Sequence, residues 1–153
     1  METVIAGRNT LIGSLQELIT LNDDAIEALS LAIARVGDPA DRGLLKRLLE
    51  DHHRHLLELE ALARDLGAEA PESGRRAATS TNLRGLIGDR AVLDAIKMNE
   101  DDACAAYERA ALREGLPENV RTLLGRGLAN ERRHRDSLAA ELDAAGGLLL
   151  LLL

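Results

Sequence analysis

Apolar residues recur along most of the chain with a period close to 3.6, which is the spacing of one face of an α-helix. In the first such segment, Leu11, Leu15 and Leu18 begin a series that continues to Val36. The later segments repeat this pattern, mostly with Leu, Ile and Ala. The pattern predicts four helices, over about residues 10–36, 39–66, from 82–89 to 114, and 117–144.

Glycine and proline mark the ends of these segments. Gly37-Asp38-Pro39 separates the first two helices, and Gly115-Leu116-Pro117 separates the last two. The connection at 68–81 is rich in Pro, Gly, Ser and Thr and is long for a hairpin loop, so we expect it to cross the length of the molecule. Two helical hairpins joined in this way predict an all-α four-helix bundle with one long crossover. The predicted division is a leader at 1–9, a bundle at 10–146 and a leucine tail at 147–153.

The two hairpins resemble each other in sequence, which indicates an internal repeat. Leu21-Asn22-Asp23-Asp24-Ala25 resembles Asn99-Glu100-Asp101-Asp102-Ala103, and the two Gly-x-Pro turns match at the same offset. After one inserted residue, Arg54-His55 matches Arg133-His134. The repeat therefore pairs Asn22 with Glu100, His52 with Glu131, and His55 with His134.

Six polar residues fall on the apolar faces of the predicted helices. Glu131 and His134 are one helical turn apart, and so are His52 and His55. Because antiparallel helices rise equally, counting from the turns places all six at a similar height in the bundle. Burying such groups without partners costs several kcal/mol in order of magnitude, so they are expected to meet. The predicted layer consists of Asn22, His52, His55, Glu100, Glu131 and His134.

A Glu-x-x-His motif with a single carboxylate on the neighbouring helix resembles the di-metal pattern of the ferritin-like superfamily, which includes bacterial members of unassigned function. The resemblance covers about Leu11 to Leu142. The second half matches in full, with Glu100 as the single carboxylate and Glu131-x-x-His134 as the motif. The resemblance implies a metal site and, if the protein is an enzyme, an iron-dependent oxidation of iron(II) or reduction of peroxide. A stress-related role in a bacterial cytoplasm would follow from the family.

The first half departs from the family pattern. Asn22 stands where a carboxylate is expected, and His52 stands where the glutamate is expected. Two carboxylates and three histidines suit one iron(II) or zinc ion better than a pair of ferric ions. A competing register, Glu50-x-x-His53, fits the motif literally but leaves His52 unexplained in the core. The expected ligands are Glu100, Glu131, His134, His52 and His55, with Asn22, Glu50, His53 and Tyr107 as additional candidates.

Composition narrows the choice of partners. The formal net charge is -7 with both signs mixed along the chain, which argues against a nucleic-acid surface. The single cysteine, Cys104, excludes an intramolecular disulfide and fits a cytoplasmic protein. No signal peptide is evident, and the run of leucines at 148–153 is shorter than the roughly 20 residues that cross a bilayer. A homodimer is the default expectation for the assembly.

Two functions remain open at this point. One is a metal-binding protein of the ferritin-like kind, enzymatic or not. The other is a non-catalytic structural or interaction bundle, in which the polar layer fixes helix register and carries no metal. In that case the leucine tail and the arginines Arg132, Arg133 and Arg135 would serve as partner surfaces.

Overall fold

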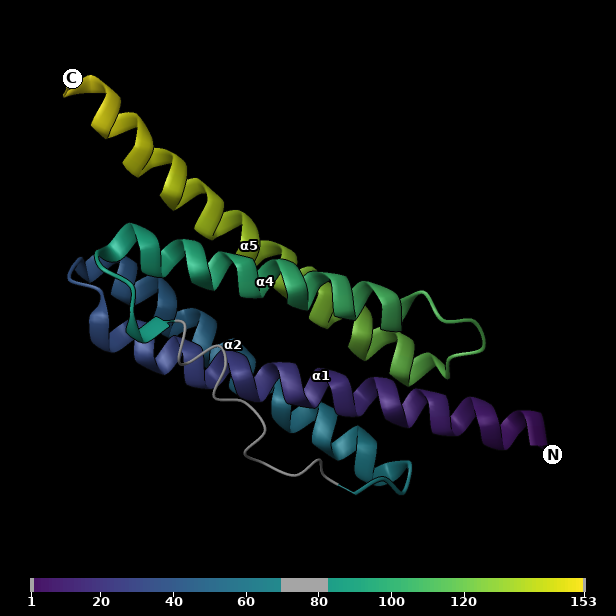
Figure 1. Cartoon of the computed structure of the whole chain (residues 1–153). Coiled ribbons are helices and arrows are strands. Elements are labelled where there is room, and N and C mark those ends of the chain that lie inside the picture. The colour runs from purple at the N-terminus through teal and green to yellow at the C-terminus, as the bar shows by residue number, and fades with distance from the viewer. Residues whose placement is uncertain (1, 70–82, 153) are drawn as a thin grey trace.

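The computed structural model describes residues 2–69 and 83–152 of the chain. Its long helices are α1 (Glu2–Arg35), α2 (Pro39–Asp65), α4 (Asp89–Ala111) and α5 (Glu118–Leu151). Helices α1 and α2 form one antiparallel hairpin and α4 and α5 form the other; α1 packs on α4, and α2 packs on α5. The chain leaves α2 beside Arg8 near the start of α1, where Arg8 donates to the Leu66 carbonyl, and it returns beside Arg35 at the end of α1, where Arg35 donates to the Leu83 carbonyl (Figure 1). The predicted all-α, one-crossover bundle of two hairpins is therefore confirmed, although most of the crossover itself lies outside the described residues.

The first turn is fixed by hydrogen bonds from both hairpins. Asp38 caps α2, because its carboxylate accepts the backbone N–H groups of Ala40 at 2.7 Å and Asp41 at 3.3 Å. Asp89, the first residue of α4, accepts the backbone N–H groups of Gly37 and Asp38, each at 2.9 Å. A carboxylate at the start of the second hairpin thus holds the turn of the first, which sets the two hairpins in register.

Two helices extend beyond the predicted bounds. Helix α1 begins at Glu2, and its residues 2–10 are exposed. Helix α5 continues through Gly146 to Leu151. A helix that leaves the core no longer needs an apolar face, so the periodicity of apolar residues could not predict these extensions. In α5, the leucines have a high enough helix propensity to continue the helix past the glycine pair. The division into leader, bundle and tail stays a prediction.

The core consists of two apolar clusters, one toward each end of the bundle. The cluster around Leu15, Tyr107 and Leu124 lies on one side of the polar layer. The cluster around Leu29, Ile96 and Leu138 lies on the other. Of the described residues, seven polar or charged ones are buried, and six of them are the residues of the predicted layer. The layer therefore interrupts an otherwise apolar core in the middle of the bundle.

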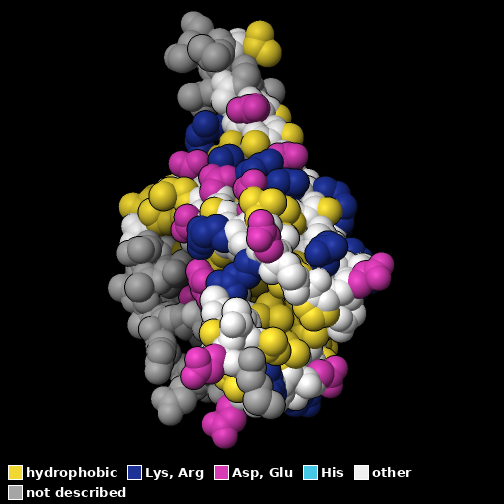
Figure 2. All heavy atoms as spheres, turned by 90° about the vertical axis from the view of Figure 1, so that its right-hand side faces the viewer, with side chains coloured by type: hydrophobic (Ala, Val, Ile, Leu, Met, Phe, Trp, Pro, Cys, Tyr) yellow, Lys and Arg dark blue, Asp and Glu magenta, His cyan; other side chains and the backbone are white. Residues whose placement is uncertain are grey.

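The end of the bundle that carries the α4–α5 turn is hollowed and apolar. Figure 2 looks at this end, where hydrophobic side chains show in a depression between charged residues. The hollow has a volume of about 720 Å³, and Leu11, Leu66, Leu116 and Pro117 are among the residues that line it. None of the described helices has a stretch long and apolar enough to cross a membrane.

Candidate metal centre

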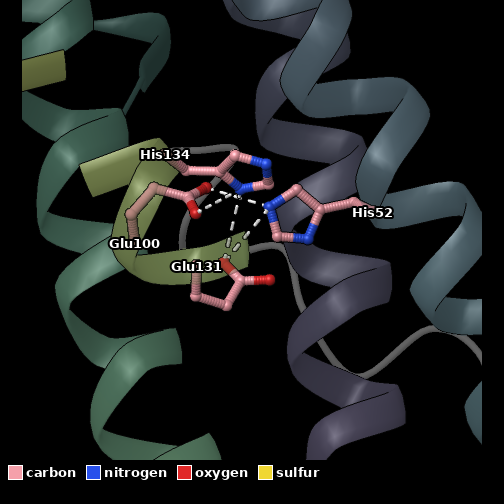
Figure 3. A group of neighbouring side chains, drawn as sticks. All are labelled: His52, Glu100, Glu131 and His134. Carbon is pink, nitrogen blue, oxygen red and sulfur yellow. Dashed lines mark hydrogen bonds and ion pairs between the residues drawn. The ribbon is translucent and has the colours of Figure 1, made fainter. Parts of the chain in front are cut away.

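Four buried side chains from three helices converge in the middle of the bundle. His52 comes from α2, Glu100 from α4, and Glu131 and His134 from α5 (Figure 3). Each offers one ligand atom, and these atoms lie within 4.8 Å of one another. The helical spacing brings Glu131 and His134 onto one face of α5, and the antiparallel packing brings Glu100 to the same height. Imidazole nitrogens and carboxylate oxygens are ligands that divalent transition metals accept.

The distances between these atoms match the edges of a small coordination sphere. Nε2 of His52 lies 3.0 Å from Oε1 of Glu100 and 3.8 Å from Oε2 of Glu131. Nδ1 of His134 lies 3.3 Å from Oε2 of Glu100 and 3.6 Å from Oε2 of Glu131. Ligands that sit about 2.1 Å from a shared tetrahedral ion are roughly 3.4 Å from each other. The four side chains therefore fit one metal ion with small adjustments.

Both histidines of this group are oriented by a second hydrogen bond at the outer ring nitrogen. Nδ1 of His52 donates to Oδ1 of Asn22 at 2.9 Å, and Nε2 of His134 is 2.9 Å from Oδ2 of Asp51. Metal-ligating histidines usually donate the other N–H to a carbonyl or carboxylate, which fixes the tautomer and leaves the inner nitrogen for the metal. Asn22 and Asp51 have the places and the chemistry of such outer partners.

Glu131 has one oxygen without a hydrogen-bond partner, although His134 and His52 lie at ion-pair distances of 3.6 and 3.8 Å from it. The residue is fully buried, and Oε1 accepts a hydrogen bond from Nδ1 of His55 at 3.1 Å. Oε2 is the one buried side-chain polar atom of the described residues without a hydrogen-bond partner. Leaving such an oxygen unsatisfied costs roughly 1–3 kcal/mol or more for a charged group. A cation at the centre of the group would satisfy it.

His55 lies beside the four-residue group and acts on Glu131. Its Nε2 is 2.9 Å from Nδ2 of Asn130, which donates to it, so the ring proton sits on Nδ1 and points at Glu131. The histidine has both ring nitrogens engaged by protein atoms. Its nitrogens are not among the four converging ligand atoms, and it contacts the group through the carboxylate of Glu131.

The layer keeps its charges despite burial, because opposite charges face each other. Burial lowers the pKa of His134, but hydrogen bonds to Glu100 and Glu131 outweigh it and raise the pKa to about 10. Burial opposes the charge of His52 as well, yet Glu100 raises its pKa above the ordinary value. Burial raises the pKa of Glu131, but the nearby His134 and the hydrogen bond from His55 hold it far below the usual range. Without metal, His134 therefore keeps its proton at neutral pH, and a divalent ion would bind there by displacing it.

Residues 10–114 match the family described as "Domain of unknown function (DUF2383)". The chain belongs to the DUF2383 family. No curated protein sequence matches it.

Solved structures resemble this DUF2383 protein in fold. A conserved hypothetical protein from Mycobacterium tuberculosis aligns over 85% of this chain and 95% of its own with a TM-score of 0.75 and 14% identity. A two-domain protein from Anabaena variabilis, with DJ-1/ThiJ/PfpI-like and ferritin-like domains, aligns over 92% of this chain and 38% of its own with a TM-score of 0.76 and 12% identity. A hypothetical protein from Pyrococcus furiosus aligns over 87% of this chain and 88% of its own with a TM-score of 0.69 and 17% identity. At these identities the likeness shows a ferritin-like fold alone.

The DUF2383 match ends before the second half of the site. It includes Asn22, His52 and Glu100, while Glu131 and His134 lie on α5 beyond residue 114. The buried group that could hold a metal therefore combines residues inside and outside the matched region. The assignment of its members as metal ligands stays a prediction.

The additional candidates lie in different environments. Glu50 and His53 are exposed on the outer side of α2, so the competing register does not reach the layer. Asn22 is buried, where Nδ2 donates to the Leu18 carbonyl at 2.8 Å and to the Tyr107 hydroxyl oxygen at 3.1 Å. The Tyr107 ring packs edge-on against His55 at a centroid distance of 6.0 Å, and burial raises the pKa of its hydroxyl.

Sequence reasoning missed Asp51 and Asn130. Asp51 binds His134 and Asn130 binds His55, and in the repeat these two histidines are equivalent. The repeat also aligns Asp51 with Asn130, each immediately before a residue of the layer. That alignment was the available signal, but both residues are only half-buried and lie off the apolar stripes, so periodicity did not select them.

Proposed function

We propose that this DUF2383 protein binds one divalent metal ion, iron(II) or zinc, in its polar layer. The observation that carries the proposal is the buried group of four ligand atoms in which Oε2 of Glu131 has no partner. His52, Glu100, Glu131 and His134 would be the ligands. Asn22 and Asp51 would orient the two histidines, and His55 would hold Glu131.

Charge balance supports a single ion. The carboxylates of Glu100 and Glu131 neutralise one divalent cation, whereas a second cation would leave a net positive charge in a buried site. Where the ferritin-like pattern has further acids, this chain has Asn22 and His52, and the two are hydrogen-bonded to each other. The ligand set is thus richer in nitrogen than a two-iron centre, which suits a borderline ion.

The chemistry of the site depends on which ion it holds. Iron(II) would donate one electron to oxygen or peroxide and become iron(III), whereas zinc would act as a Lewis acid. For iron, we also propose the redox role that the ferritin-like resemblance implies. The proposal includes a location in the cytoplasm and a dimeric assembly. The protein's own residues would bind the ion, fix its ligands and keep bulk water out of an apolar surrounding.

The second candidate is a non-catalytic bundle that keeps the layer for structure. Its support is that nearly every buried polar atom of the layer has a protein partner. Such layers can fix register, and replacing one by packed apolar residues is often neutral or stabilising. The two candidates therefore differ in what they expect of an apolar substitution at Glu131.

The melting temperature of chelator-treated protein, with and without added metal, tests the proposal. The ions to add are iron(II) under anaerobic conditions, zinc and manganese. At about one hundred times its dissociation constant, an ion that binds should stabilise the folded protein by roughly 2.7 kcal/mol, which raises the melting temperature by roughly 5–10 °C. Glu131→Leu should abolish the shift, while Glu50→Gln on the exposed side of α2 should retain it. A wild-type protein whose melting temperature ignores all three ions would favour the structural candidate.

A further inference from the structure

A second polar site lies on the outside of the bundle, between α2 and α5. It is a pocket of about 290 Å³. Of its lining, His55 and Gly127 are buried, Glu58 and Asn130 are half-buried, and the three arginines and Ala129 are exposed. The lining residues are Arg54, His55, Glu58, Arg126, Gly127, Ala129, Asn130 and Arg133.

The pocket carries an excess of positive charge in an acidic protein. Three arginines line it against one glutamate, Glu58, although the chain as a whole has a net charge of -7. Arg54 is paired with Asp51 at 2.6 Å. Arg126 and Arg133 have no ion pair or hydrogen bond with any described residue. Two guanidinium groups are therefore available in one concave place.

Helical geometry directs these groups into the pocket from one side. Arg126, Asn130 and Arg133 follow one another at spacings of four and three, so they share a face of α5. The neighbouring arginines behave differently, since Arg132 pairs with Glu108 at 3.9 Å and Arg135 pairs with Asp136 at 3.2 Å. Arg132 and Arg135 are thus paired with carboxylates outside the pocket, whereas Arg133 lines it.

We propose that this pocket binds a small organic oxyanion, a phosphate or a dicarboxylate, through Arg126 and Arg133. The planar guanidinium offers paired N–H donors that match the geometry of both oxyanions. Asn130 lies between the two arginines along the helix and adds an amide to the pocket wall. The volume admits a metabolite-sized anion, which distinguishes the pocket from a patch that only collects counterions. This proposal is independent of whether the polar layer holds metal.

Isothermal titration calorimetry on the full chain in chelator tests the proposal. Inorganic phosphate and succinate are titrated separately, with sodium chloride at equal ionic strength as the baseline. The wild-type protein should bind at least one of the two saturably with one site per chain. The double variant Arg126→Gln/Arg133→Gln should weaken that binding at least tenfold. The double variant Arg132→Gln/Arg135→Gln removes the same charge outside the pocket and should leave the affinity within about twofold, as expected if contacts and not net charge hold the ligand.

The two titrations also separate the two kinds of oxyanion. Binding of phosphate alone assigns the pocket to phosphate-bearing ligands, and binding of succinate alone assigns it to carboxylates. Absence of saturable binding for both anions would overturn the proposal. An equal loss of affinity in the two double variants would also overturn it, because that result would mean that long-range charge, and not contact with Arg126 and Arg133, holds the anion. Because the measurement is made without metal, its failure says nothing about the polar layer.

Discussion

The carboxylate of Asp51 lies 2.9 Å from Nε2 of His134, across the contact between α2 and α5. Its counterpart in the other half of the repeat, Asn130, makes the matching contact to His55. One pair ends in a carboxylate and the other in an amide. His134 and His55 therefore differ in their surroundings. Only His134 has an acidic partner at its outer nitrogen, and its inner nitrogen faces both Glu100 and Glu131.

Asp51→Asn should weaken metal binding by about 10- to 100-fold, which is the usual cost of removing an outer partner of a ligating histidine. The amide keeps the shape of the side chain but removes the negative charge that helps to fix the ring of His134. Competition against a coloured chelator would measure the affinity. Asp136→Asn, on the exposed side of α5, is the matched control and should change nothing. Equal affinity in wild type and Asp51→Asn would show that His134 is not a ligand.

Two glycines of α5 should respond in opposite ways to alanine. A Cβ at Gly127 would lie 2.4 Å from Cε1 of Tyr107, whereas a Cβ at Gly125 would meet nothing within 4 Å. Gly125→Ala should therefore stabilise the protein by roughly 0.5–1 kcal/mol through helix propensity. Gly127→Ala should destabilise it by roughly 1–3 kcal/mol, because the ring must move. Urea denaturation would compare the two, and stabilisation by both would contradict the packing of Tyr107 on Gly127.

The metal-free protein should lose stability as the pH rises above neutrality. His134 has a pKa of about 10 in the folded protein against an ordinary value of 6.5, so the folded state holds a proton that the unfolded state releases. The stabilisation from this group is complete below about pH 6.5 and disappears as the pH approaches about 10. Urea midpoints at pH 7 to 10 in chelator would show it, and His134→Gln should flatten the slope. A midpoint that is constant over this range in wild type would contradict the ion pairing.

Asp41 should destabilise the folded protein at neutral pH. Burial raises its pKa to about 6, and Glu141, Asp38 and Asp89 add to the effect. The folded state therefore binds an extra proton between pH 3.8 and about 6, and stability from this group falls as the pH rises through that window. Asp41→Asn should raise stability at pH 7.5 by about 1 kcal/mol, less than the full shift because solvent screens the site. The gain should vanish near pH 4, and an equal gain at both pH values would exclude titration as its cause.

The fold and the position of the polar layer followed from periodicity and from the internal repeat. Antiparallel helices of equal rise leave little freedom in height, so counting from Gly37 and Gly115 was enough to bring Glu100 level with Glu131. The exposed ends of α1 and α5 did not follow, since a helix outside the core carries no apolar signal. The different places of His52 and His55 did not follow either. Both lie on the inner face of α2, and the rotation of that helix decides which ring meets Glu100 and which meets Asn130.

Elemental analysis of protein purified without chelator tests the metal proposal most directly. We expect about one iron or zinc ion per wild-type chain, because the carboxylates of Glu100 and Glu131 neutralise a single divalent charge. The folded Glu131→Leu variant, purified in parallel, should contain about a tenth of that amount or less. A wild-type chain that is free of metal after purification, and that takes up neither ion when supplied, would contradict the proposal and leave the layer a structural one.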